Sequence, residues 1–321
     1  MIKFRSKPTP ASVVGVLVLF VISSFIAFKH QHIIHANTLL RLSLLVAVAF
    51  VSLFFLFVEP IAQPQQYHDF ADKRLFLCSC HSQGLFLPPT NDIDGRRNNN
   101  QTTAGFIIPN FGDVVSNIVI LIGGLSGAFL LHRKENGEID DSIRNWQLEI
   151  CLPIFFYSTI AISFGSSYYH WNPNNKTLIW DRLPMTLAFV SIFCYMLEDY
   201  VFPNEGIGIS LLSPLLVLGI VSVMYWNYTD DLRLYALVQF FPLFVMAFLL
   251  IFCQPCRYGG AVQQALALLL YALAKISEDK DYQIWALTKK TISGHSVKHI
   301  LAGLASLSIA SILISNEEAL V

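Results

Sequence analysis

Long runs of apolar residues dominate this 321-residue chain and constrain its fold more than any other feature. Roughly 20 apolar residues in a helix are enough to span a bilayer. The chain has two leading runs at about 11–28 and 39–58, and seven more at about 114–132, 150–169, 183–201, 208–226, 232–252, 260–276 and 295–314. Within lipid the backbone must satisfy its own hydrogen bonds, so these runs are expected to be helices. The sequence therefore predicts an all-α membrane protein.

Composition supports this prediction and limits the kinds of partner that the chain is expected to bind. Charged residues make up 13% of the chain, against about 25% in soluble domains. The formal net charge is −1, which does not favour nucleic acid as a partner. The lipid bilayer is the expected environment.

The order of the runs predicts three parts. Residues 1–58 form an N-terminal extension with two transmembrane helices, although the basic residues before the first run would also suit a signal peptide. Residues 59–110 form a polar loop, with a disordered insertion at about 78–105 that is rich in Asn, Pro and Gly. Residues 111–321 form a seven-helix core. The predicted fold is a seven-transmembrane bundle with an extra N-terminal helix pair.

Three histidines are candidate metal ligands. His170 ends the second core run, and His295 and His299 open the seventh. A spacing of four places the last two imidazoles on one helix face. Alternating crossings bring all three to one side of the membrane, and three imidazoles are the protein half of a catalytic zinc site. Taken singly, each histidine also suits an interfacial side chain that bonds to water or a carbonyl.

Two further residues suit catalysis beside such a metal. Asp181 is expected to precede the third core helix and could accept a proton from water and deliver it to a leaving amine. Ser166 lies four positions before His170, so it shares that face and could help hold an oxyanion. The alternative readings are a local ion pair between Asp181 and Arg182, and a Ser166 hydroxyl that bonds its own helix backbone.

These residues resemble a known family. Ser166-x-x-x-His170, Asp181 and His295-x-x-x-His299, together with PNFGDVVSN at 109–117, are similar to the motifs of alkaline ceramidases. The phrases FGSSYYHWNPNN, WDRLPMTLAF and SGHSVKHILAG are similar to the plant and bacterial branch of ceramidase-like proteins, which includes alkaline phytoceramidases. The resemblance covers about residues 66–315 apart from the insertion. It places the chain among seven-span membrane hydrolases, a set that also includes the adiponectin and progestin receptors.

The resemblance implies a site and a reaction. Zinc would be held by His170, His295 and His299, with Asp181 and Ser166 as catalytic residues. The reaction would be hydrolysis of the N-acyl bond of ceramide or phytoceramide, giving a sphingoid base and a fatty acid. Relatives also carry a calcium site near the N-terminus. The nearest residues here are Asp69, Asp72 and Asn110, with Asn110 at a position where an acidic residue is expected.

Two other functions remain open at this point. A receptor or lipid-binding scaffold of the same fold would show little turnover. A transporter is the third reading, but broken helices in paired halves are not evident in the sequence.

Sequons indicate a side of the membrane. Asn100, Asn175 and Asn227 each begin an Asn-x-Thr sequence in a predicted loop on the face of the candidate site. Glycans are added in the lumen, so the sequence predicts a lumenal site in the endoplasmic reticulum or Golgi.

Overall fold

The computed structural model describes residues 58–79, 82–87, 105–133, 150–201, 206–253 and 260–318. The two predicted leading helices lie outside these residues, apart from Val58, as does the middle of the predicted insertion. Those two predictions are therefore not tested.

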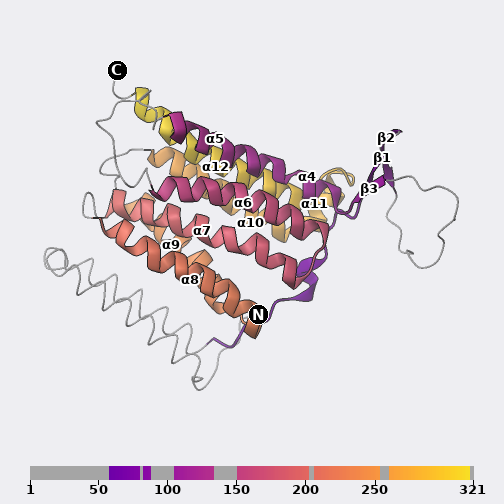
Figure 1. Cartoon of the computed structure of the whole chain (residues 1–321), viewed down its shortest axis with the longest axis horizontal. Helices are drawn as coiled ribbons and strands as arrows, with labels where there is room; N and C mark the ends of the chain where they lie inside the picture. Colours follow the sequence, from indigo (N-terminus) through magenta and orange to yellow (C-terminus); the bar gives the residue numbers. More distant parts are fainter. Residues whose placement is uncertain are drawn as a thin grey trace.

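Helices of the described part run side by side in one bundle (Figure 1). In chain order they are α4 Phe111–Val115, α5 Asn117–Arg133, α6 Leu152–Trp171, α7 Asn175–Tyr200, α8 Ile207–Thr229, α9 Arg233–Phe252, α10 Ala261–Asp279, α11 Asp281–Leu287 and α12 Gly294–Glu318. Each of the seven predicted core runs forms a helix. The chain is a multi-pass membrane protein by helix length and hydropathy.

Five stretches of the described part are long and apolar enough to cross a bilayer. They are Phe111–Arg133, Asn175–Tyr200, Gly208–Thr229, Arg233–Phe252 and Gly294–Ile314. α6 and α10 are not among these five, because α6 contains several Ser, Thr and Tyr residues and α10 carries Gln, Lys and Glu. The predicted count of seven spans is thus supported for five helices.

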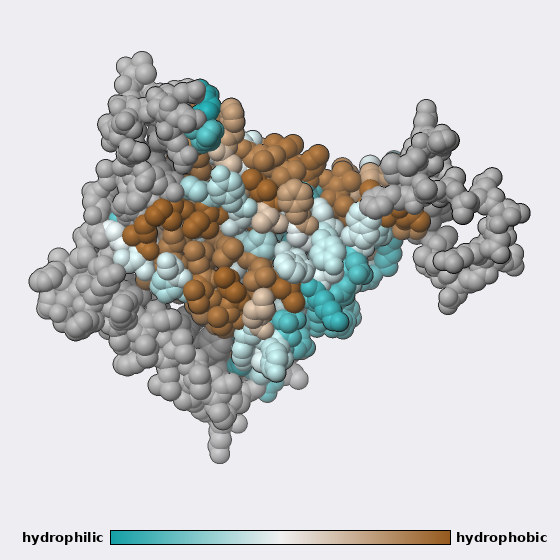
Figure 2. Space-filling model, in the orientation of Figure 1, coloured by the Kyte–Doolittle hydropathy of each residue, from teal (hydrophilic) through white to brown (hydrophobic). Residues whose placement is uncertain are grey.

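Figure 2 shows where the surface is apolar in the described part. Apolar side chains cover the middle of the bundle, and hydrophilic ones gather toward the end with residues 58–74 and the start of α7. A lipid-facing belt next to a polar end is the pattern expected of a protein embedded in a bilayer.

The central helices approach closely because α5 is lined with glycine. α5 lies between α6 and α12, with which it makes extensive contact. A Cβ at Gly127 would lie 2.1 Å from the Phe156 ring, and one at Gly123 would lie 2.8 Å from the Gly303 carbonyl oxygen. Small residues at such contacts let helix backbones pack tightly in membranes. This packing brings the ends of α6 and α12 together.

The start of α7 differs from the prediction. The apolar run at about 183–201 predicted that the third core helix starts after Asp181, but α7 begins at Asn175. Asn174 accepts hydrogen bonds from the backbone N–H groups of Lys176 and Thr177, and the Thr177 hydroxyl accepts from the Asn174 N–H, which completes a capping box. Asp181 therefore lies inside a helix rather than in a loop.

A small sheet lies in the segment for which only a polar loop was predicted. β1 Leu75–Ser79, β2 Ser82–Leu87 and β3 Gly105–Ile108 pair antiparallel in the order β2-β1-β3. A 3-10 turn, η1 Gln65–His68, precedes them. The described part is therefore all-α in its bundle, with a three-stranded sheet outside it. The short apolar runs at 75–77 and 85–87 were too brief to stand out beside the spans.

Candidate metal centre

Three buried histidines meet at one end of the bundle. His170 is in the last turn of α6, and His295 and His299 are in the first turns of α12. One ring nitrogen of each lies within 4.8 Å of those of the other two. The ring centroids are 4.6 Å apart for His170–His295, 4.9 Å for His170–His299 and 5.0 Å for His295–His299. The spacing of four on α12 and the packing of α6 together produce this cluster.

The first turn of α12 is held by two caps. The Ser293 hydroxyl accepts a hydrogen bond from the Ser296 N–H at 2.8 Å, as an N-cap residue does. The His295 N–H donates to Asp281 Oδ1 at 2.9 Å, and the other oxygen of Asp281 accepts from the Ala71 N–H at 2.8 Å. The helix that carries two of the histidines is thereby tied to α11 and to the segment before β1.

Side chains around the cluster orient two of the rings. His299 Nδ1 lies 2.8 Å from Ser116 Oγ, and Nε2 of the same ring lies 3.4 Å from Ser166 Oγ. The contact with Ser116 leaves His299 Nε2 facing the cluster. His295 Nε2 lies 3.1 Å from Lys298 Nζ, which also donates to Glu278 at 2.8 Å. Lys298 therefore stands at the edge of the cluster.

His170 is different, and it provides the test of whether a metal fits. It is fully buried, and neither of its ring nitrogens has a hydrogen-bond partner within the described residues. A buried polar group without a partner costs roughly 1–3 kcal/mol. A metal ion would offset that cost, because it accepts the imidazole lone pair. The residues present thus fit a metal ion held by three imidazoles, a donor set typical of zinc.

The two predicted catalytic residues lie beside this cluster. Asp181 is buried in the second turn of α7, and its carboxylate is within hydrogen-bonding reach of the Ser166 hydroxyl. Ser166 in turn contacts His299. The metal-ligand group found among the described residues contains the three histidines and not Asp181. Asp181 is therefore placed next to the cluster rather than in it.

A cavity of about 310 Å³ extends from the cluster into the bundle. Asp181, Ser166 and His299 line its polar end. Its remaining wall is mainly apolar and comes from α5, α6, α7, α9, α10 and α12, including Ile120, Phe155, Met185, Leu243 and Ile309. A mainly apolar wall with a few polar groups at one end is typical of a binding site for a small apolar molecule.

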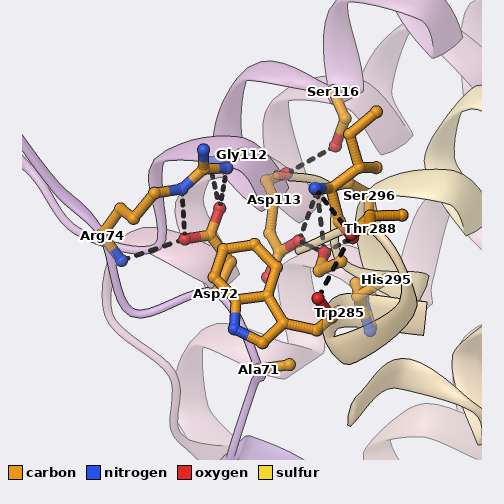
Figure 3. A network of polar contacts seen from close by, with 12 residues as sticks. Ala71, Asp72, Arg74, Gly112, Asp113, Ser116, Trp285, Thr288, His295 and Ser296 are labelled. Atoms are coloured by element: carbon orange, nitrogen blue, oxygen red, sulfur yellow. Dashed lines mark hydrogen bonds and ion pairs between the residues drawn. The ribbon is translucent and has the colours of Figure 1, made fainter. Parts of the chain in front are cut away.

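A second polar network supports the cluster from outside (Figure 3). Asp113 Oδ1 accepts hydrogen bonds from the hydroxyls of Ser293 and Ser296. Asp72 accepts from the guanidinium of Arg74 at 2.6 and 2.8 Å and from the Gly112 N–H at 2.9 Å. The network joins α4 to α12 and to the chain before β1.

The residues considered for calcium are placed as follows. Asp72 is bound by Arg74, as described above. Asp69 is exposed, and hydrogen bonds from Lys73 and Tyr282 hold the pKa of its carboxyl below the usual range. The Asn110 amide donates to the His170 carbonyl oxygen at 2.8 Å. Each of the three thus has its own partner, and the calcium site stays a prediction.

Sequence reasoning missed several residues around the site. Ser116 lies in the motif 109–117 and Lys298 lies between the two α12 histidines, so both belong to the quoted motifs, but neither was assigned a function. Glu278 and Arg182 also line the cavity. A charged residue inside an apolar run is the signal that could have drawn attention to Lys298. Glu278 and Arg182 lie just outside the predicted runs 260–276 and 183–201, so this signal does not reach them.

No protein-family model matches the chain, and no curated protein matches it. What is established is a multi-helix membrane protein with a buried three-histidine cluster that could hold a metal ion.

Proposed function

We propose that this protein is a zinc-dependent membrane amidase of the alkaline ceramidase type, with a seven-span core. It would hydrolyse the N-acyl bond of ceramide or phytoceramide to a sphingoid base and a fatty acid. The observation that carries the proposal is the His170–His295–His299 cluster at the polar end of an apolar cavity. The resemblance of the surrounding motifs to that family supports the choice of substrate.

The chemistry divides between the metal and the chain. His170, His295 and His299 would hold zinc, which would supply a Lewis acid able to polarise a carbonyl and to lower the pKa of water toward about 7. The apolar cavity binds and orients the acyl chain, so that the amide lies at the polar end. The Asp181 carboxylate accepts a proton from the water that attacks the amide carbon and returns it to the departing amine nitrogen as the C–N bond breaks. The Ser166 hydroxyl donates a hydrogen bond to the oxygen on which negative charge develops.

Surrounding residues keep this arrangement in place. Ser116 fixes the orientation of the His299 ring, and Asp281 holds the first turn of α12. The dense packing around the buried cluster excludes bulk water, which strengthens electrostatic interactions inside the site.

Zinc quantification paired with product analysis tests the function. Purified protein is expected to hold about one zinc ion per chain and to release sphingoid base and fatty acid from at least one member of a ceramide panel. A chelator should abolish the reaction, and added zinc should restore it. Metal binding without turnover on any ceramide would favour the receptor or scaffold alternative, and full activity in metal-free protein would contradict the mechanism.

We further propose a lumenal site in the endoplasmic reticulum or Golgi. Asn100 lies outside the described residues. Asn175 is the first residue of α7, with its amide oxygen 2.8 Å from His68 Nε2, and Asn227 is in the last turn of α8. These two sequons therefore do not lie in loops as predicted, which leaves Asn100 as the best acceptor. A glycosidase-sensitive mobility shift, removed by Asn100→Gln, is expected, and cleavage of a tag near residue 98 from the cytosolic side would reverse the topology.

A further inference from the structure

The polar end of the cavity carries an excess of positive charge. Among the described residues, three cations line it, Arg182, Lys275 and Lys298, and two carboxylates, Asp181 and Glu278. Glu278 is shared between both lysines, since its two oxygens contact Lys275 and Lys298. Each lysine thus has a carboxylate partner, although the single Glu278 carboxylate neutralises only one of the two lysine charges. Arg182 has no carboxylate within ion-pair distance among the described residues.

Arg182 is held in place by aromatic rings rather than by an acid. Its guanidinium carbon lies 4.1 Å from the Trp226 ring centroid, 4.6 Å from that of Tyr235 and 5.6 Å from that of Tyr67. The Gln63 side-chain oxygen accepts one hydrogen bond from Arg182 at 2.6 Å. Ring contacts stabilise the cation through its face and leave its in-plane N–H groups available.

One end of this guanidinium has no partner. Arg182 is 5% exposed, and its Nη1 atom makes no hydrogen bond within the described part of the chain. The Nε1 atom of the neighbouring Trp226 is also buried without a partner there. Both groups are hydrogen-bond donors, so a ligand that satisfies them must supply a hydrogen-bond acceptor. A buried charged donor without an acceptor is costly, and an ionisable residue at membrane depth is a functional candidate.

We propose that Arg182 anchors the carboxylate of an acyl lipid whose hydrocarbon chain occupies the apolar part of the same cavity. A guanidinium forms short, charge-assisted hydrogen bonds to a carboxylate. The lining residues carry a formal excess of one positive charge, which matches a carboxylate better than a phosphate dianion. The apolar wall beyond Arg182 suits the attached chain.

Two sources could bring such a carboxylate, and here the inference rests on the proposed function. An amidase at this site could take an N-acyl amino acid, whose headgroup is acidic, as a substrate in addition to a neutral ceramide. Alternatively, it would meet a carboxylate in its own fatty acid product. The recognition chemistry is the same in both cases.

Equilibrium binding to the full chain in detergent tests the anchor without requiring turnover. N-dodecanoylglycine is compared with N-dodecanoylglycinamide, a neutral partner of nearly the same size. The native protein is expected to bind the acid on the order of 10-fold more tightly. Arg182→Met should remove this preference, and Arg182→Lys should keep part of it, because the charge remains but the planar fork is lost.

Lys176→Met is the matched control, since Lys176 is an exposed cation on the same helix. It should keep the full preference. Equal binding of the two ligands by the native protein would overturn the proposal. So would a preference that survives Arg182→Met, which would assign the carboxylate to the metal or to Lys298. Thermal unfolding of each variant shows that the comparison is made on folded protein.

A second ligand pair, dodecanoate and dodecanol, distinguishes the two sources. An Arg182-dependent preference for N-dodecanoylglycine alone indicates an acidic substrate headgroup, and one that extends to dodecanoate indicates the fatty acid product. Either result supports the anchor. Arg182-dependent binding by a protein that hydrolyses no amide would contradict the proposed function and leave the anchor standing.

Discussion

Arg233 and Arg182 are both buried at the same end of the bundle, but their surroundings differ. Arg233 donates to both oxygens of Asp231, at 2.6 and 3.0 Å, and to the Val58 carbonyl oxygen at 2.7 Å. Arg182 has one hydrogen bond, to Gln63, and a set of aromatic neighbours. A satisfied buried ion joins segments of the chain, whereas an unsatisfied one next to a cavity indicates a ligand.

The same contrast separates Asp72 from the histidine cluster. Asp72 is saturated by Arg74 and the Gly112 N–H, as in Figure 3, and it ties β1 to α4. His170 is equally buried and has no partner for either ring nitrogen within the described residues. Asp72 has protein partners and needs no ligand, whereas the three histidines could hold a metal ion. Variants at the histidines should therefore lose metal and activity, whereas variants at satisfied buried pairs should lose stability.

The largest effect is expected when a metal ligand is removed. His170→Ala, His295→Ala and His299→Ala should each lose bound metal and ceramide hydrolysis together, because two imidazoles hold zinc far less tightly than three. Metal content and product release are measured on the same preparation. His132→Ala, at the exposed end of α5, is the control and should retain both. A variant of one of these three histidines that keeps full activity without metal would contradict the assignment of the cluster as a metal site.

Removal of a satisfied partner should act on stability instead. Asp231→Ala removes the carboxylate that accepts from the buried Arg233, and loss of one partner of a buried pair costs about 3–5 kcal/mol of unfolding free energy. Thermal unfolding in detergent measures the loss, and the folded fraction should still bind metal. Lys73→Ala breaks an exposed pair with Asp69 and should cost less than about 1 kcal/mol. Similar unfolding temperatures for the two variants would show that the buried pair is not structural.

A smaller effect, confined to turnover, is expected at the carboxylate beside the cluster. Asp181→Asn should keep the metal and lower turnover by on the order of 10²-fold, as for a lost general acid or base. Ser166→Ala should cost less, since it removes one contact to the oxyanion while the metal remains. Steady-state kinetics with metal analysis separates these roles. Normal turnover by Asp181→Asn would exclude the role given to Asp181.

The smallest of the four effects is expected outside the ligands. Ser116→Ala removes the contact that orients the His299 ring and should weaken metal binding by about 10- to 100-fold. Competition with a zinc chelator of known affinity measures this change. Ser308→Ala removes a hydroxyl that bonds the Gln263 carbonyl oxygen instead, and it should leave the affinity unchanged. Equal affinities for the two variants would mean that Ser116 has no part in the site.

Local sequence patterns were enough to predict the positions of the core helices and the three candidate metal ligands. The apolar runs predicted where the seven core helices lie, because a helix within lipid requires only that its own stretch be apolar. The spacing of four in His295-x-x-x-His299 placed two imidazoles on one face, because the helical period is a local property. Alternating crossings then predicted that His170 would join them.

Only the tertiary structure decided which groups surround that site. Ser116 meets His299 across 183 residues and Gln63 meets Arg182 across 119, and such contacts follow from helix packing that no local period encodes. A capping box at Asn174 and Thr177 starts α7 before Asp181, whereas the apolar run begins only at about 183, so hydropathy placed the start of this helix too late. The partner of each buried group depends on the whole bundle, so the difference between satisfied Arg233 and unsatisfied Arg182 appears only in the folded chain.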